Sequence, residues 1–99
     1  MSRLDKAALV TAVGSKLGAR PDPTGTVDLV TDNGHIAVAA TVAEARPAIA
    51  RLTAIDGYRW LVINAADLFA VNPLTIGTKV GIIDATGRVL KNADVPRKK

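Results

Sequence analysis

The sequence predicts a single α+β domain with a mainly antiparallel sheet, and three observations support this fold class. The chain has 99 residues, about the size of one ordinary domain. Two segments, 26–40 and 78–92, have the pattern of β-hairpins, and a strand at 58–64 lies between them. Two further segments, 3–17 and 42–55, carry apolar residues at helical spacing. Successive hairpins packed with two helices are typical of an α+β domain.

The first helix is expected over residues 3–17. Ser2 and Asp5 resemble a capping box, because both side chains can accept hydrogen bonds from free N–H groups of a first turn. Gly18 suits the left-handed conformation that ends many helices. Apolar residues recur at helical spacing at Leu9, Val10, Val13 and Leu17. Gly14 inside this helix costs about 1 kcal/mol against alanine, so we expect another element to cross closely there.

The segment TVDLVTDNGHIAVAA (26–40) is the clearest local signal. Asn33 and Gly34 form the pair most favoured in a type I′ turn, in which both central residues have positive φ. Pro21 and Pro23 precede this hairpin in a short linker, where they block both helix and central strand. The predicted turn pairs Leu29 with Val38 and Val27 with Ala40 on one face, and places Asp28, Val30, Ala37 and Ala39 on the other.

The second helix is expected over residues 42–55, with Thr41 and Glu44 as a capping box and Gly57 as the stop signal. Its apolar stripe comprises Ala45, Ile49, Leu52 and Ile55. Pro47 conflicts with this helix, because a proline ring past the first turn clashes with an earlier carbonyl. The helix therefore either kinks at Pro47 or begins later, near the first residue of the stripe.

Residues 58–64 have bulky side chains on both faces, as in a central strand that is covered on two sides. A short helix is expected in AADLFAV (65–71) with Asn64 as its cap, although this segment could also continue extended. The following NPLTIG (72–77) is expected to be a turn or loop.

The segment GTKVGIIDATGRVLK (77–91) has the composition of a phosphate-binding loop but the pattern of a hairpin. A Walker loop needs a lysine followed by serine or threonine at the start of a helix, whereas Lys79 precedes Val80 and a β-branched run. Asp84 can open a turn, and Gly87 occupies a natural positive-φ position. We therefore predict a hairpin here and no nucleotide site.

No constellation in the sequence predicts a catalytic, metal or cofactor site. His35 is the single histidine, and the predicted hairpin places it opposite Asp32. A nucleophile is missing, because the chain has no cysteine and its serines, Ser2 and Ser15, belong to the first helix. A metal site would have to combine His35 and Asp32 with Asp28, which lies several residues from the hairpin tip. A hydrolase or metal protein built around His35 is therefore the weakest functional hypothesis.

The apolar composition favours protein–protein contact. The chain is 48% hydrophobic but only 3% aromatic, so a domain of this size must place part of its small apolar residues outside. They are either ordinary monomer surface, which is more than half apolar, or surface that other subunits cover. The candidate interface residues are the three aromatics, Tyr58, Trp60 and Phe69. Tyr58 and Trp60, with Arg59 between them, also resemble a small stacking platform for single-stranded nucleic acid, but further aromatic and basic neighbours are missing.

The net charge of +4 is concentrated at the C-terminus. Three of these charges come from the candidate electrostatic tail, Arg97, Lys98 and Lys99. In the rest of the chain basic and acidic residues nearly balance, unlike the clustered basic face of a nucleic-acid-binding domain. We expect one domain over residues 1–95, followed by a solvated or partner-bound basic tail at 96–99.

These features predict a non-enzymatic structural protein that acts as a repeated subunit of a larger protein assembly. A small tailed-phage virion component, such as a capsid decoration or connector subunit, is one such protein, suggested by its class alone. The expected partners are the protein itself or a larger protein lattice, with no cofactor. The alternative is a small basic nucleic-acid-binding module that uses Arg97 to Lys99, Arg59 and neighbouring lysines.

The sequence also bears on location. The N-terminal segment carries charges among its apolar residues and lacks the apolar core of a secretory signal. No apolar run approaches the roughly 18 residues of a membrane span. We therefore expect the protein in a virion or in the cytoplasm, without secretion by a signal peptide and without a membrane segment.

Overall fold

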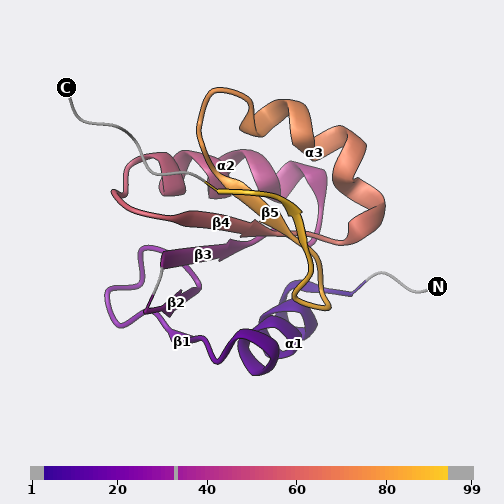
Figure 1. Cartoon of the computed structure of the whole chain (residues 1–99). Coiled ribbons are helices and arrows are strands. Elements are labelled where there is room, and N and C mark those ends of the chain that lie inside the picture. The colour runs from indigo at the N-terminus through magenta and orange to yellow at the C-terminus, as the bar shows by residue number, and fades with distance from the viewer. Residues whose placement is uncertain (1–3, 33, 94–99) are drawn as a thin grey trace.

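The computed structural model describes residues 4–32 and 34–93, which form a six-stranded mixed sheet with helices on both faces (Figure 1). One helix, α1, covers one face, and α2 and α3 lie on the other. The elements are α1 (Lys6–Leu17), β1 (Arg20–Pro21), β2 (Leu29–Thr31), β3 (Gly34–Val38), α2 (Val42–Thr53), β4 (Arg59–Val62), the 3₁₀ turn η1 (Ala65–Asp67), α3 (Leu68–Thr75), β5 (Gly81–Ile83) and β6 (Val89–Lys91).

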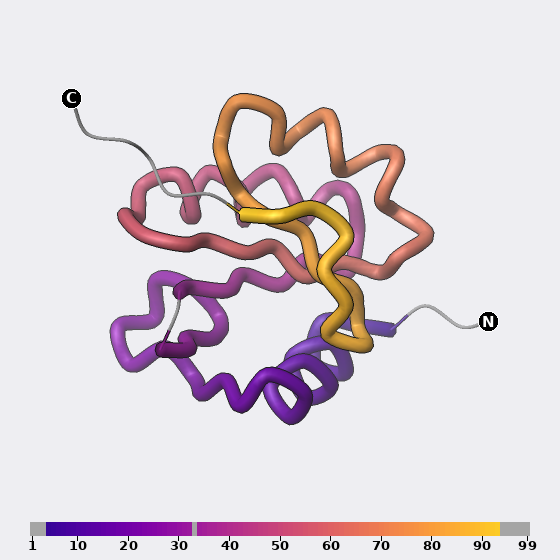
Figure 2. The backbone as a smooth tube through the Cα atoms, in the orientation of Figure 1, coloured from indigo at the N-terminus to yellow at the C-terminus, as the bar shows by residue number. Residues whose placement is uncertain are grey.

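The strand order in the sheet follows the order in the sequence, so the chain crosses the sheet from one edge to the other (Figure 2). β3, β4 and β5 are parallel, because α2 and α3 carry the chain back between them. The pairings of β1 with β2, β2 with β3 and β5 with β6 are antiparallel. The predicted α+β domain is confirmed. A hairpin lies toward each edge of the sheet, and the strands at the centre of the sheet are parallel, which the hairpin patterns do not indicate.

Each face of the sheet has its own core. On the α2 and α3 side the buried residues include Ala37, Ala39, Leu61, Ile63 and Ile82 of the sheet region and Ala45, Ala48, Leu52 and Val71 of the helices. On the other side Leu9 and Val13 of α1 pack in one cluster with Leu29, Ile36, Val38, Val62 and Ile83. The alanines of the first core let α2 approach the sheet closely, which explains the small-residue composition.

The predicted first helix is confirmed, with corrections at its start. Asp5 is the N-cap, and its carboxylate accepts a hydrogen bond from the N–H three residues later (2.8 Å). Gly18 ends the helix with a left-handed φ of 63°, as expected. Ser2, the other predicted capping residue, lies outside the described residues. The close crossing expected at Gly14 is wrong, because a Cβ there would have as its nearest neighbour the Ala19 carbonyl oxygen at 3.7 Å, an ordinary contact.

The register of the first hairpin differs from the prediction by two residues. Leu29 faces Ile36 instead of Val38, so Gly34 belongs to β3 and not to the turn. Gly34 lies in β3 beside the start of β4, where the His35 N–H donates to the Tyr58 carbonyl (3.0 Å) and a Cβ at Gly34 would lie 2.5 Å from that oxygen, so the glycine serves this close approach and not the turn. A shift of two residues preserves the alternation of side chains, so most residues still point to the predicted face.

The alternation of side chains between the two faces of the sheet ends before β2. Val27, predicted on the face of Leu29, is instead buried in the core under α2. The Asp28 side chain takes the place of a neighbouring strand for Val38, because the Val38 N–H donates a hydrogen bond to Asp28 Oδ2 (2.7 Å). Its Oδ1 pairs with the Nζ of Lys6 in α1 (3.0 Å). Asp28 therefore joins α1 to the β2–β3 hairpin.

The capping box of α2 is confirmed. Thr41 Oγ1 accepts a hydrogen bond from the Glu44 N–H (3.2 Å), and Glu44 Oε1 accepts one from the Ala40 N–H (3.0 Å). The helix begins at Val42 and continues through Pro47, so the alternative of a later start is wrong. Pro47 lies on the exposed side of α2. Because proline has no N–H, the carbonyl group one turn earlier loses its helical donor, and water can bond that carbonyl group instead.

The chain after β4 is more helical than predicted. η1 and α3 extend to Thr75, so the first four residues of NPLTIG are helix and not loop, with Pro73 inside it. Asn64 does not cap this helix through its side chain. Its Nδ2 donates to the Leu4 (3.0 Å) and Ala40 (3.2 Å) carbonyls, and its Oδ1 accepts from the Leu4 N–H (3.0 Å). This buried amide ties the start of α1 to the ends of β3 and β4.

The second hairpin is confirmed. Asp84 Oδ1 accepts hydrogen bonds from the N–H groups of Thr86 (2.9 Å) and Arg88 (3.1 Å), and Gly87 has a φ of 84°. The first strand starts later than predicted, at residue 81, because the preceding residues form a turn in which Lys79 has a φ of 63°.

Gly81→Ala and Gly14→Ala are expected to change stability in opposite directions. A Cβ at Gly81 would lie 2.5 Å from two ring carbons of Trp60 and 2.7 Å from the Ala93 nitrogen. Such overpacking lowers the free energy of unfolding by about 1–3 kcal/mol. Gly14 has room, so alanine there should raise that free energy by up to about 1 kcal/mol. Urea unfolding measures both, and a Gly81→Ala protein as stable as the wild type would contradict the close contact with Trp60.

Asp84→Asn is expected to lower stability at neutral pH by an amount that shrinks in acid. Burial alone would raise the pKa of Asp84, but hydrogen bonds from Thr86 and Arg88 and the Arg88 charge outweigh it and hold the pKa below its usual 3.8. A lowered folded-state pKa stabilises the fold above the unfolded value, and this contribution is lost as the pH falls through the folded value. Urea unfolding of both proteins at a series of pH values measures the difference in stability. If that difference did not change with pH, the charge of the Asp84 carboxylate would not be its source.

Candidate protein–protein interface

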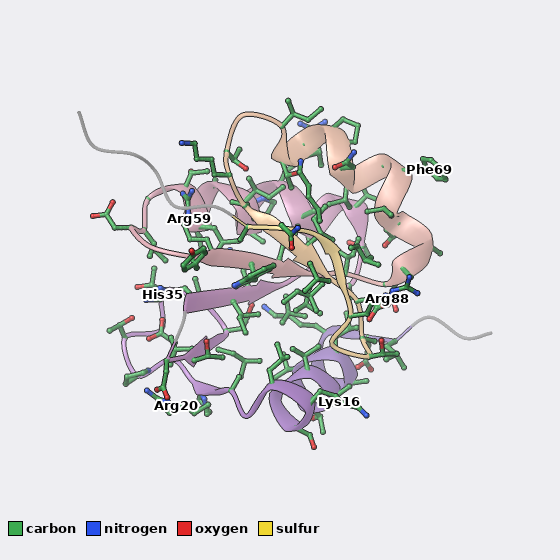
Figure 3. The ribbon with its side chains drawn as sticks, viewed as in Figure 1. Lys16, Arg20, His35, Arg59, Phe69 and Arg88 are labelled. Atoms are coloured by element: carbon green, nitrogen blue, oxygen red, sulfur yellow. The ribbon has the colours of Figure 1, made fainter. Side chains whose placement is uncertain are left out.

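α3 has no charged side chain on its exposed surface. No residue from 68 to 76 is acidic or basic. Five of them are nevertheless exposed: Phe69, Ala70, Asn72, Pro73 and Ile76. The side chain of Phe69 projects away from the body of the protein and is 94% exposed, and Ile76 is 69% exposed (Figure 3). A surface helix normally presents charged and polar residues to water, so this exposed side resembles a binding face.

The inner side of α3 fixes the position of this exposed side. Val71 and Thr75 are buried against the sheet and α2, and Leu68 and Leu74 pack partly against the same core. Since these residues recur at helical spacing, the helix cannot rotate without losing their burial. Phe69 is therefore held in an outward position by the packing of its neighbours.

An open groove of about 570 Å³ runs between α3 and β6. It is lined by Leu68, Phe69, Asn72, Pro73, Leu90 and Lys91, and these six residues are called the α3–β6 surface below. Four of the six side chains are apolar, and they come from segments about twenty residues apart in the sequence. A groove with an apolar floor and few polar groups is suited to an apolar side chain of another chain.

The ammonium group of Lys91, which lines this groove, is bonded to α3. Its Nζ donates to Thr75 Oγ1 (2.8 Å), and the Thr75 hydroxyl donates to the Asn72 carbonyl (2.9 Å). The ammonium group thus lies at the C-terminal end of α3, where the helix dipole favours a positive charge. The methylene groups of the side chain remain as part of the groove.

β6 forms one edge of the described sheet, next to this groove. It pairs with β5 alone, and Val89 is 46% exposed. β1 forms the opposite edge, with two residues, one of which is Pro21. An edge strand presents unpaired backbone groups, and proline is one of the residues that block such an edge.

The three predicted interface aromatics do not form one patch. Trp60 is partly buried on the α1 side of the sheet, where its ring packs over Gly81. Tyr58 directly precedes β4 and is 44% exposed. Phe69 lies on the other side of the sheet, on α3. Phe69 is thus the only one of the three that lines the α3–β6 surface, while Trp60 is chiefly a packing residue.

Sequence reasoning missed most of the α3–β6 surface. The sequence pattern predicts a turn or loop for Asn72 and Pro73 and ordinary hairpin positions for Leu90 and Lys91. The uncharged run from 68 to 76 was the available signal, since an exposed helix of that length without a charge is unusual. The predicted tail, Arg97 to Lys99, lies outside the described residues.

The residues considered for chemistry are separated. His35 faces Val30 and Arg59 on its neighbouring strands, and not Asp32 as expected. The Asp32 side chain is 93% exposed and pairs with Arg20 (3.6 Å), while Asp28 contacts α1. Within residues 4–32 and 34–93, no three histidine or carboxylate side chains are close enough to hold a metal ion.

Arg59 is a buried structural residue. Only 3% of it is exposed, and its guanidinium donates to the Leu52 carbonyl in the last turn of α2 (3.4 Å) and to the Thr78 carbonyl before β5 (2.7 Å). Its positive charge lies at the C-terminal end of α2, where the helix dipole stabilises it. Arg59 and His35 lie at the same end of the sheet (Figure 3). Arg59 is therefore unavailable to a phosphate at the surface, contrary to its use in the nucleic-acid alternative.

No family model, no curated protein and no solved structure matches this chain. In the described part of the chain, none of the helices has both the length and the apolar character needed to cross a membrane. The candidate interface therefore rests on the geometry of this chain alone.

Arg59→Ala is expected to lower the free energy of unfolding by about 2–3 kcal/mol, because a buried and a partly buried carbonyl group lose a charged donor. Arg51→Ala is the matched control. Arg51 is exposed on α2, so its truncation should change stability by less than about 0.5 kcal/mol. Urea unfolding of both variants measures the difference. Equal effects would contradict the structural role of Arg59.

Proposed function

We propose that the protein is a non-enzymatic structural subunit that self-associates through the α3–β6 surface and so builds a larger protein assembly. The observation that carries this proposal is the 94% exposed Phe69 on a helix without charged residues. Full burial of a phenylalanine side chain contributes about 2–3 kcal/mol, which the monomer leaves unused. An exposed apolar groove beside it offers the complementary half of a contact.

The surroundings of the surface support association between proteins more than binding to nucleic acid. Most of its side chains are apolar, and the ammonium group of Lys91 is already bonded to Thr75. Contact with phosphates depends on clustered basic side chains, and Arg59 is buried. The absence of a catalytic constellation in the described residues fits a structural role, which is why the proposal is a non-enzymatic one.

The finer proposal is a subunit of a tailed-phage virion, such as a capsid decoration or connector protein. Its only support is the general class named above, that of small self-assembling subunits, and no residue of this chain adds to it. Detection of the chain in purified particles, at a fixed ratio to the main capsid protein, is the measurement that decides it.

Phe69→Lys is expected to reduce self-association, because it places a charge in the apolar contact. Thr11→Lys adds the same charge to an exposed position of α1, on the other face of the sheet, and is the matched control. Light scattering of the wild type at about 0.1 mM should give a mass above that of the monomer, which the control retains and Phe69→Lys lowers. A monomeric wild type would contradict the proposal.

Salt separates the two functional hypotheses. Apolar association responds weakly to salt, so the mass should persist at about 0.5 M sodium chloride, where exposed charges are largely screened. Replacing Arg97, Lys98 and Lys99 with glutamine should leave the mass measured by light scattering unchanged. Tight binding of generic DNA at low salt, lost in that tail variant, would instead favour the nucleic-acid alternative.

A further inference from the structure

A second groove lies on the other side of α3, between this helix and α2. The two helices lie side by side on one face of the sheet (Figure 1). The groove has a volume of about 200 Å³. It is lined by Arg46, Ile49 and Ala50 of α2 and by Leu74 of α3, and these four residues are called the α2–α3 groove below. Sites for small molecules usually have about 300–1,000 Å³, so this smaller groove is better suited to an apolar side chain of another protein.

Two basic residues at this groove have no acidic partner. Arg46 is exposed and lines the groove, and Lys79 is exposed in the turn after α3. This turn lies beside the last turn of α2, because the Arg59 guanidinium donates to the carbonyls of both Leu52 and Thr78. Among the described residues, no carboxylate forms an ion pair with Arg46 or Lys79. The groove therefore combines an apolar floor with positive charges that lack a counter-charge.

The acidic residues of the chain are mostly engaged by the chain itself. Glu44 is the one acidic residue of α2, and it accepts the hydrogen bond from the Ala40 N–H. The other described acidic residues that have a partner within the chain are Asp5, Asp22, Asp28, Asp32, Asp67 and Asp84. Of the described acidic residues this leaves Asp56, which is exposed. Two copies that met groove to groove would also bring their Arg46 side chains together, so charge favours a different protein as the partner.

We propose that the α2–α3 groove binds an acidic amphipathic helix of a different protein, with an apolar side chain between Ile49 and Leu74 and a carboxylate at Arg46. This inference goes beyond the proposed function, because self-association uses the α3–β6 surface on the other side of α3. An amphipathic helix lays its apolar stripe into a groove and keeps its flanks for polar contacts. The carboxylates then select the partner, and the apolar contact stabilises the complex.

Nucleic acid fits this groove less well than an acidic helix. Ile49, Ala50 and Leu74 offer no aromatic ring on which a base could stack. Tight binding to phosphates needs several clustered basic side chains, and the groove has Arg46 with Lys79 nearby. An acidic helix uses both the apolar floor and the positive charge.

Two synthetic helical peptides test the groove. One contains only leucine, alanine and glutamate, with leucine at helical spacing, and the other has lysine in place of every glutamate. Fluorescence anisotropy of the labelled peptides is measured with the full-length protein at up to about 0.5 mM. The glutamate peptide is expected to bind at least about tenfold more tightly than the lysine peptide. Equal binding of the two peptides, or no binding of either, would overturn the proposal.

Charge reversal at Arg46 locates the contact. Arg46→Glu should weaken binding of the glutamate peptide about tenfold and strengthen binding of the lysine peptide. Arg51→Glu is the matched control, because Arg51 is exposed on the same helix and does not line the groove. It should change either affinity by less than about threefold, with folding of both variants checked by circular dichroism. Equal effects of the two variants would show a general response to charge and overturn the site.

Two further measurements separate the other possible occupants. Without peptide, light scattering should give the same mass for the wild type, Arg46→Glu and Asp56→Asn. A lower mass in either variant would assign the groove to a second copy, and a single-stranded oligonucleotide that binds the wild type but not Arg46→Glu would assign it to nucleic acid. Either result would overturn the proposal.

The two proposals fail in different ways. Peptide binding and its loss in Arg46→Glu test the α2–α3 groove, whereas the mass of the wild type and of Phe69→Lys tests the α3–β6 surface. A monomeric wild type that binds the glutamate peptide would reject self-association alone. A wild type that self-associates but binds neither peptide would reject the groove alone.

Discussion

The close packing of α2 on the parallel strands is the constraint on which the rest of the structure depends. Ala45 and Ala48 of α2 belong to one buried core with Ala37 and Ala39 of the β3 segment, and none of the four is exposed. Small side chains on both surfaces let the helix approach the sheet closely, at the cost of little apolar area per residue. The connection from β3 through α2 to β4 is then fixed, and with it the parallel centre of the sheet.

Two polar side chains secure the ends of this unit. Arg59 bonds the last turn of α2 and the turn before β5 at one end of β4. Asn64, just beyond the other end of β4, bonds the backbone of Leu4 and Ala40. Each side chain bonds segments that lie far apart in the sequence. Together they fix the positions of the connecting segments relative to the sheet. Their role is positional, and neither is arranged for chemistry at the surface.

The exposed side of α3 follows from the same arrangement. The chain must return from the end of β4 to the start of β5, and α3 makes this return on the face that α2 already covers. Val71 and Thr75 complete the core, and no further layer lies above the opposite side of the helix in the described structure. An uncharged outer side on such a helix leaves apolar area of the monomer in water, and this is the observation from which the assembly role is proposed. β6, the edge strand of the described sheet, lies next to it and lines the same groove.

Much of the local structure could be predicted from the sequence, because it depends on short-range chemistry. The capping box at Thr41 and Glu44 and the Asp84–Gly87 turn involve residues three apart, and both are confirmed. Gly18 likewise ends α1 as expected. The α+β class followed from counting such elements. The candidate interface was predicted only in part, through Phe69.

The tertiary structure decided the features in which distant segments meet. By its local preference Gly34 belongs in a turn, but the hairpin register differs by two residues and places it in β3, where the backbone of Tyr58 lies so close that only a glycine fits. The sequence places Trp60 in the core or at an interface, and only the structure shows that Gly81 on the neighbouring strand gives its ring a place to pack. The groove of the α3–β6 surface joins a helix and a strand that share no local pattern. The sequence by itself determined which segments form helices and turns, because those energies are local, whereas register, parallel pairing and the groove depend on which distant backbones can approach one another.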